Sequence, residues 1–96
     1  MEGLLINSMP KLSEFFGIKI TLRPGEAPHR LPHFHAQYGG EKVSLAIGTL
    51  EVLAGKMNPR ALGLVIEWAF QHRPELHAAW EDLKAGRAPR KIEPLH

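Results

Sequence analysis

The chain has 96 residues, of which 44% are hydrophobic and 23% charged, and its formal net charge is +2. These values are typical of one ordinary soluble domain, and the small net charge excludes a protein that is basic throughout. The absence of cysteine excludes disulfides, thiolate metal sites and cysteine nucleophiles. No apolar run approaches the roughly 20 residues that a membrane helix needs, so we expect no membrane partner.

The beginning of the chain lacks the basic start and the long apolar run of a signal peptide. We therefore expect residues 1–8 to be an N-terminal extension and residues 9–96 to form a single domain, with residues 9–14 as its lead-in. After the lead-in, every second position is apolar, which predicts a strand with one face on the core. The apolar positions are Phe16, Ile18, Ile20 and Leu22.

A loop rich in proline and glycine follows over residues 23–28. Pro32 suits the first position of a strand, and the residues after it alternate again. This alternation places Phe34, Ala36 and Tyr38 on the core side of the strand and His33, His35 and Gln37 on the other side. Gly39-Gly40 then predicts a tight hairpin turn into a third strand, in which Val43, Leu45 and Ile47 point inward.

Residues 50–54 predict a fourth short strand, and a helical turn capped by Thr49 is the alternative. Asn58-Pro59 predicts a helix start, because asparagine caps free amides and proline fits the first helical position. This helix runs to Arg73, and a second follows over residues 75–85. The order predicts an α+β fold: an antiparallel, three- to four-stranded β-meander followed by a helical hairpin packed on one sheet face. The segment 90–95 adds a short edge strand or simply packs down.

Positive charge is concentrated near the C-terminal end of the sequence. Only Glu93 opposes it after Asp82. Such a cluster predicts a solvated basic tail, and phosphate binding is the alternative. The cations are Lys84, Arg87, Arg90 and Lys91.

If the apolar sides of the three strands turn toward the helices, their other sides form one exposed surface. That surface holds several cations and hydroxyls and no carboxylate from these strands, which predicts a phosphate or a nucleic-acid backbone as ligand. Lys19, Arg23 and Lys42 are the predicted phosphate-binding residues. An ordinary solvent-facing side of an antiparallel sheet is the alternative. The remaining members of the surface are Thr21, His33, His35, Gln37 and Ser44.

Two histidines at i and i+2, His33 and His35, project the same way from a strand, about 6.5–7 Å apart at the backbone. With His29 from the preceding loop they could act as acid and base catalysts, because histidine titrates near neutral pH. The same three side chains could instead hold a divalent transition metal with one position open. Hydrogen-bonded structural histidines are the third alternative. We expect no other cofactor, and the residues alone assign no reaction.

Short strings of residues occur along the chain in a characteristic order. They include Phe15-Phe16-Gly17-Ile18, Pro32-His33-Phe34-His35-Ala36, residues 50–56 and His72-Arg73-Pro74-Glu75-Leu76. Together, over residues 9–95, they resemble the bacterial family called domain of unknown function 4160. The family usually has an aspartate before the first histidine, where this chain has Pro28.

The resemblance implies a small cytoplasmic protein that is encoded beside another small protein and is the toxin of a toxin–antitoxin pair. We therefore expect a toxin–antitoxin component that acts on RNA through His29, His33 and His35. The alternatives are a metal-binding protein that uses the same histidines, and a non-enzymatic interaction module. Its partner would be the product of the neighbouring gene.

Overall fold

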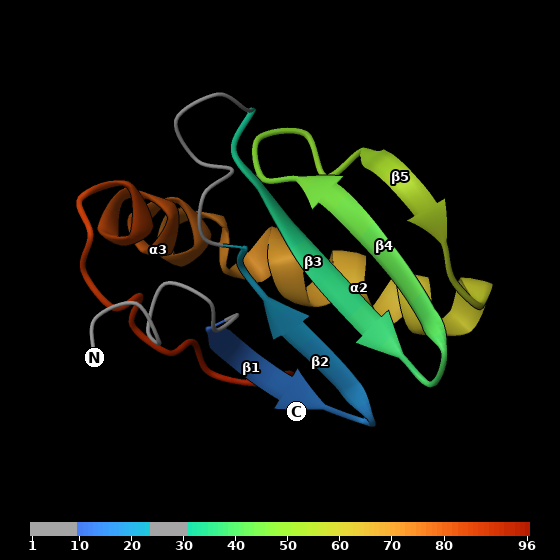
Figure 1. Cartoon of the computed structure of the whole chain (residues 1–96). Coiled ribbons are helices and arrows are strands. Elements are labelled where there is room, and N and C mark those ends of the chain that lie inside the picture. Colours follow the sequence, from blue (N-terminus) through green and yellow to red (C-terminus); the bar gives the residue numbers. More distant parts are fainter. Residues whose placement is uncertain (1–9, 24–30) are drawn as a thin grey trace.

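The computed structural model describes residues 10–23 and 31–96. Within them the chain forms an antiparallel five-stranded sheet in the order β1-β2-β3-β4-β5, followed by two helices (Figure 1). The α+β meander is as predicted, with five strands rather than three or four. The elements are β1 (Lys11–Phe15), β2 (Ile18–Thr21), β3 (His33–Tyr38), β4 (Glu41–Ala46), β5 (Val52–Lys56), α2 (Pro59–Gln71) and α3 (Arg73–Lys84).

The strand that the sequence did not predict is β1, where we expected a lead-in. It pairs with β2, and its register shifts between Lys11 and Ser13. Because of this bulge, two consecutive residues, Leu12 and Ser13, are both buried. The period-two pattern that reveals a strand is therefore broken. The predicted extension over residues 1–8 lies outside the described residues.

Phe16 is not the core residue of a strand that its spacing predicts. It lies in the two-residue turn between β1 and β2, where Phe16 has φ 50° and Gly17 has φ 80°. Both angles are positive, as the tightest hairpin turns require. The Phe16 side chain is 61% exposed. Phe15 takes the core position instead, with its ring centroid 5.4 Å from that of Trp68.

The later elements follow the prediction closely. The predicted strand over residues 50–54 is β5, displaced by two positions toward the C-terminus. Asn58 caps α2, since its side-chain oxygen accepts hydrogen bonds from the amides of Arg60 and Ala61 at 2.9 and 3.1 Å. Only His72 separates the two helices. No helix within residues 10–23 and 31–96 is long and apolar enough to cross a membrane.

The core lies between the sheet and α2, which crosses behind it (Figure 1). Phe34 and Trp68 are both fully buried there, with ring centroids 6.2 Å apart. The indole nitrogen of Trp68 donates a hydrogen bond to the Glu93 carbonyl oxygen at 2.7 Å, which fastens the C-terminal segment. That segment packs beside β1 and is not a strand. The Ile92 amide donates to the Leu12 carbonyl oxygen at 2.8 Å.

Candidate functional site

The register of the sheet shows which polar side chains share a side. Gln37 lies opposite Lys19 on one neighbouring strand and opposite Lys42 on the other, and Lys42 lies opposite Lys56. Directly opposite residues project from the same side of a sheet. In the next row, His35 lies between Thr21 and Ser44. We call the surface made by these two rows the polar face: Lys19, Gln37, Lys42, Lys56, Thr21, His35 and Ser44.

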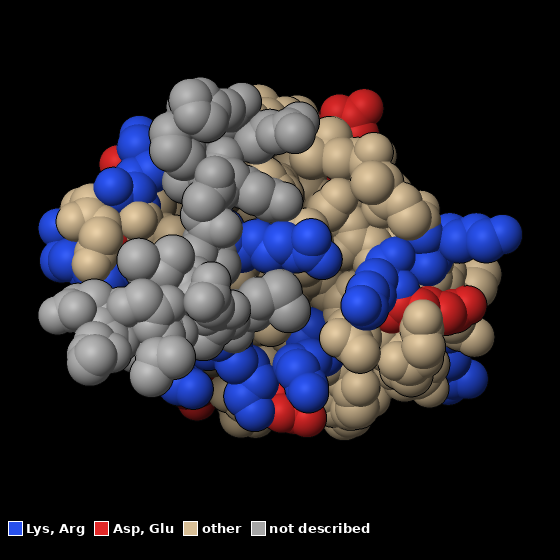
Figure 2. Space-filling view, viewed as in Figure 1, with Lys and Arg blue, Asp and Glu red and all other residues tan. Residues whose placement is uncertain are grey.

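The polar face lies on the side of the sheet away from α2. Figure 2 looks at this side and shows lysine and arginine side chains gathered over the strands. Two of the three predicted phosphate-binding residues, Lys19 and Lys42, are in the same row, and both are exposed. Arg23 is also exposed, two residues beyond Thr21 along the chain. Alternation along the chain puts Arg23 on the same side as Thr21.

The sequence did not predict Lys56 as a member of this surface. The predicted strand ended at Ala54, whereas β5 continues to Lys56. Extending the alternation from Ala54 by two positions would have found it. With Lys56 included, the first row carries three lysines over four strands.

Lys42 and Lys56 are like charges directly opposite one another, an arrangement that destabilises a sheet. Glu41, the sequence neighbour of Lys42, lies opposite Tyr38 and so projects from the other side. Its carboxylate accepts a hydrogen bond from the Asn58 amide at 2.7 Å, at the entry to α2. An anion held between the two ammonium groups would remove their repulsion, so this pair is the centre of the candidate site.

A carboxylate is present at the far end of the same row, on β1. Glu14 lies opposite Lys19, and the Lys11 ammonium nitrogen is 2.6 Å from its Oε1. The hydrogen bond from Lys11 and then its charge lower the pKa of Glu14. Glu14 is therefore ionised and paired at neutral pH. Positive charge in this row is concentrated toward β4 and β5.

His33 is buried, although we predicted an exposed side chain. Only 8% of it is accessible, and its ring centroid lies 5.3 Å from that of Trp80 in α3. Its Nδ1 is 2.7 Å from the Leu31 carbonyl oxygen. A carbonyl oxygen only accepts, so Nδ1 is the donor of this hydrogen bond. The predicted side of the strand is nevertheless correct, since the His33 and His35 rings are 5.2 Å apart.

The third predicted histidine, His29, lies outside the described residues. Among residues 10–23 and 31–96, no group of three histidines and carboxylates could hold a metal ion. The structure thus brings together two members of the predicted catalytic or metal-binding set, His33 and His35. His35 is half-buried and is the more accessible of the two.

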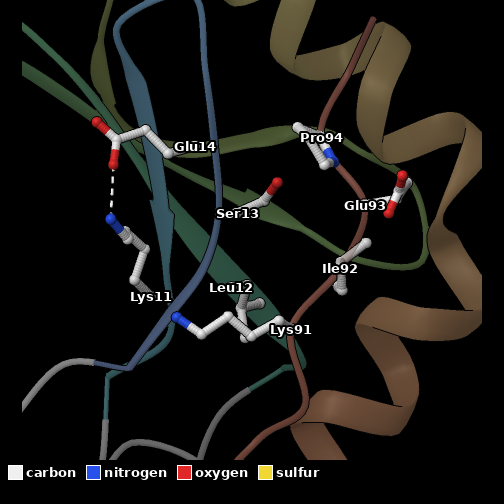
Figure 3. Close-up of a pocket in the computed structure, with 8 residues that line it drawn as sticks. All are labelled: Lys11, Leu12, Ser13, Glu14, Lys91, Ile92, Glu93 and Pro94. Carbon is white, nitrogen blue, oxygen red and sulfur yellow. Dashed lines mark hydrogen bonds and ion pairs between the residues drawn. The ribbon is translucent and has the colours of Figure 1, made fainter.

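A pocket between β1 and the C-terminal segment is less suited to an anion (Figure 3). Its lining includes two lysines and two glutamates, so the charges balance. The buried Ser13 hydroxyl, which has no hydrogen-bond partner among residues 10–23 and 31–96, lies in the same lining. The charged lining residues are Lys11, Glu14, Lys91 and Glu93.

One family model, described as Domain of unknown function (DUF4160), matches residues 17–81. The match includes every residue of the polar face and leaves out β1 and the C-terminal segment. No curated protein and no solved structure matches the chain.

Proposed function

The chain belongs to the domain of unknown function 4160 family, and because that description names no activity, we propose a function from the site itself. We propose that the polar face binds the phosphate backbone of RNA. The observation that carries this proposal is the pair of lysines, Lys42 and Lys56, directly opposite each other on β4 and β5. A fold that tolerates this repulsion gains from an anion placed between the two charges.

The extent of the row supports a chain of phosphates rather than a single one. Strands lie about 4.8 Å apart, so the three intervals from Lys19 on β2 to Lys56 on β5 span about 14 Å. Thr21 and His35 in the second row add a hydroxyl and an imidazole donor beside the lysines. Ser44, which we predicted on the exposed surface, is only 8% exposed and adds none. Such an array binds a polyanion without reading its sequence.

A binding measurement tests this proposal. A fluorescently labelled, single-stranded RNA is titrated with protein at low salt, and its anisotropy is followed. We expect Lys42→Gln/Lys56→Gln to weaken binding about tenfold or more, since two phosphate contacts are lost. The matched control is Arg60→Gln/Lys84→Gln, which removes the same charge from the two helices. Equal losses in both double variants, or no binding by the unaltered protein, would reject the proposal.

The toxin role implied by the family resemblance adds a chemical step to this binding. In this step His35 takes the proton of a ribose 2′-hydroxyl while that oxygen attacks the adjacent phosphorus, and the 5′-oxygen leaves with a proton from water. The His33 ring lies beside His35 and positions it. We expect His35→Ala to abolish RNA cleavage and growth inhibition while RNA binding is retained. Unchanged cleavage in this variant would refute the catalytic part and leave the binding proposal standing.

Metal binding is the second candidate function, supported by the closeness of the His33 and His35 rings. It needs further ligands from His29 or from water, because two imidazoles alone leave a tetrahedral site half filled. Metal analysis decides it, on protein purified without a histidine tag after growth with added zinc, nickel or iron. One metal ion per chain would support this function, and metal-free protein would reject it.

A cognate protein encoded by the neighbouring gene is the partner we propose for the third alternative, an interaction module. Co-purification of the two gene products tests it. A stable complex supports the interaction module, whereas separate elution of the two proteins counts against it.

A further inference from the structure

The two edges of the sheet differ in how they are covered. The edge at β1 is lined by the C-terminal segment, through the hydrogen bond from Ile92 to Leu12. The edge at β5 is the last strand in the sheet order, and all five of its residues are exposed. Val52 and Leu53 are 40% and 43% exposed. Natural edge strands avoid pairing through charges, prolines or bulges. The stretch Val52-Leu53-Ala54-Gly55 has no charge and no proline, and its one irregularity is the register shift at Leu53.

The ends of this exposed strand carry opposite charges, with Glu51 just before it and Lys56 at its last position. A shift in register near Leu53 decides which way they point. Val52 lies opposite the core residue Leu45, so its neighbour Glu51 is on the polar face side, and Lys56 is on that side too. Without the shift, two residues an odd number of positions apart would project from opposite sides.

This charge pattern is complementary to itself when two copies of the strand run antiparallel. With a two-fold axis between Leu53 and Ala54, Glu51 of each copy lies opposite Lys56 of the other. Both pairs lie on the same side of the joined sheet. A parallel arrangement in register would instead place Glu51 against Glu51 and Lys56 against Lys56, which is unfavourable.

Apolar surface on the helix side of the edge supports the same contact. In α2, Ile66 is 37% exposed and Phe70 is 66% exposed. The Arg73 guanidinium lies 5.3 Å from the centre of the Phe70 ring and donates to the Gly48 carbonyl oxygen at 2.8 Å. Phe70 therefore lies near the connection that leads into β5. A strand pair alone buries little area, and the exposed Phe70 ring near this connection offers more apolar surface for a dimer contact.

We propose that the protein is a two-fold symmetric dimer in which the β5 strands of two copies pair antiparallel. The two sheets then form one continuous sheet, and the polar faces continue across the axis with Lys42 and Lys56 of both copies near it. The partner that pairs with the β5 edge is thus a second copy of this chain, because its Glu51 and Lys56 are complementary to Lys56 and Glu51 of the first copy. This inference does not rest on RNA binding, but Lys56 takes part in both proposals. Lys42 lies on β4 and outside the paired edge, so Lys42→Gln should weaken RNA binding and leave the dimer intact.

Charge reversal with rescue tests the dimer. At a concentration where the unaltered protein sediments as a dimer, we expect Glu51→Lys and Lys56→Glu each to sediment as monomers, because every single variant creates like-charge pairs at both ends. The double variant Glu51→Lys/Lys56→Glu should sediment as a dimer again. Arg60→Glu, a charge reversal on α2, is the control and should leave the dimer intact.

Two results would overturn the proposal. One is an unaltered protein that stays monomeric as its concentration is raised. The other is a double variant that remains monomeric although its circular dichroism spectrum matches that of the unaltered protein, because rescue is specific to a strand that pairs with its own copy.

The absence of cysteine in the chain allows a direct second measurement. Ala54→Cys places one thiol per chain beside the axis, whereas Lys11→Cys places it on the opposite edge. A short bis-maleimide should join two chains through Cys at the first position and not at the second. Equal cross-linking of the two variants, or none in either, would contradict the proposed axis.

Discussion

Phe34 occupies the centre of the core, and its side chain is completely buried against Trp68. We expect Phe34→Ala to lower the free energy of unfolding by about 3–5 kcal/mol, because a large ring is replaced by a cavity. Urea denaturation followed by tryptophan fluorescence measures this loss. Gln37→Ala, three residues along the same strand and half-buried, is the control and should cost less than about 1 kcal/mol. A similar small loss for Phe34→Ala would show that its ring is not packed as described.

Phe16 combines two unfavourable features, an exposed apolar ring and a left-handed backbone with φ 50°. Asparagine before glycine is the preferred pair for such a turn. We therefore expect Phe16→Asn to raise the free energy of unfolding by about 1 kcal/mol, the cost of a left-handed conformation for a bulky residue. Phe15→Asn, one position earlier in the core, should instead be strongly destabilising. A destabilised Phe16→Asn variant would mean that the exposed ring contributes to stability.

Single positions show how far alternation predicts burial. It placed His33 and Tyr38 on the correct sides of β3, but the buried one is His33 and the partly exposed one is Tyr38, at 39%. Alternation predicts the side of the strand from which a side chain projects. It does not predict whether another element covers that side chain. Trp80 of α3 covers the His33 end, and Tyr38 is the last residue before the turn. The sequence contains no signal for where α3 packs.

At the scale of elements, the pairing of β4 with β5 depends on Gly55. Its φ is 80°, and a Cβ atom there would overlap the Lys42 carbonyl oxygen. Gly86 has the same φ of 80° with nothing near the position of its Cβ. We expect Gly86→Ala to cost about 1 kcal/mol from backbone strain alone and Gly55→Ala to cost clearly more.

Thermal melts compare the two alanine variants. Gly86→Ala reports backbone strain alone, whereas Gly55→Ala reports the same strain together with the overlap between the new Cβ atom and the Lys42 carbonyl oxygen. Hydrogen exchange on Gly55→Ala should show faster exchange in β5 than in β2. Equal losses of stability in the two variants would show that the close approach of Gly55 to β4 is not required.

Elements were predicted where their periodicity was regular. The caps and spacing of α2, the turn at Gly39-Gly40 and the alternation of β4 each gave one consistent pattern. β1 was missed because its bulge interrupts the alternation, and Lys56 was missed because the strand was ended two residues early. The missed lysine changes the candidate site most, since it supplies the partner of Lys42.

For the whole molecule, Asp82 joins the end of α3 to the C-terminal segment. It is 2% exposed, and Arg90 donates to its two carboxylate oxygens at 3.0 and 3.1 Å, with Arg87 donating at 3.1 and 3.3 Å. We predicted a solvated basic tail from the cations in this segment. Two of them, Arg87 and Arg90, instead bind Asp82 and so hold the segment against α3. The hydrogen bond from Arg90 is the largest cause that lowers the pKa of Asp82, from 3.8 to about 2, against the opposing effect of burial.

The lowered pKa of Asp82 predicts how the free energy of unfolding depends on pH. A carboxyl group whose pKa is lower in the folded chain contributes stability above its unfolded pKa and loses it as the pH falls through the folded value. The contribution of Asp82 should therefore be complete above pH 3.8 and should disappear as the pH falls to about 2. Urea denaturation at a series of pH values measures it.

Arg90→Gln provides the comparison for that series. It should be less stable than the unaltered protein at neutral pH, and the difference should shrink as Asp82 becomes protonated in both proteins. A difference that stays constant between pH 3.8 and about 2 would show that Arg90 stabilises the fold through packing and not through the charge of Asp82.

If Lys42 and Lys56 contact phosphates, the salt dependence of RNA binding must change when both lysines are replaced. For single-stranded RNA, the slope of log K against log salt concentration is about −0.7 per phosphate contact. We expect the slope of Lys42→Gln/Lys56→Gln to be shallower than that of the unaltered protein by about 1.4, because two contacts are lost. Arg60→Gln/Lys84→Gln should keep the original slope. Three identical slopes would show that RNA binds without contacts to these two lysines.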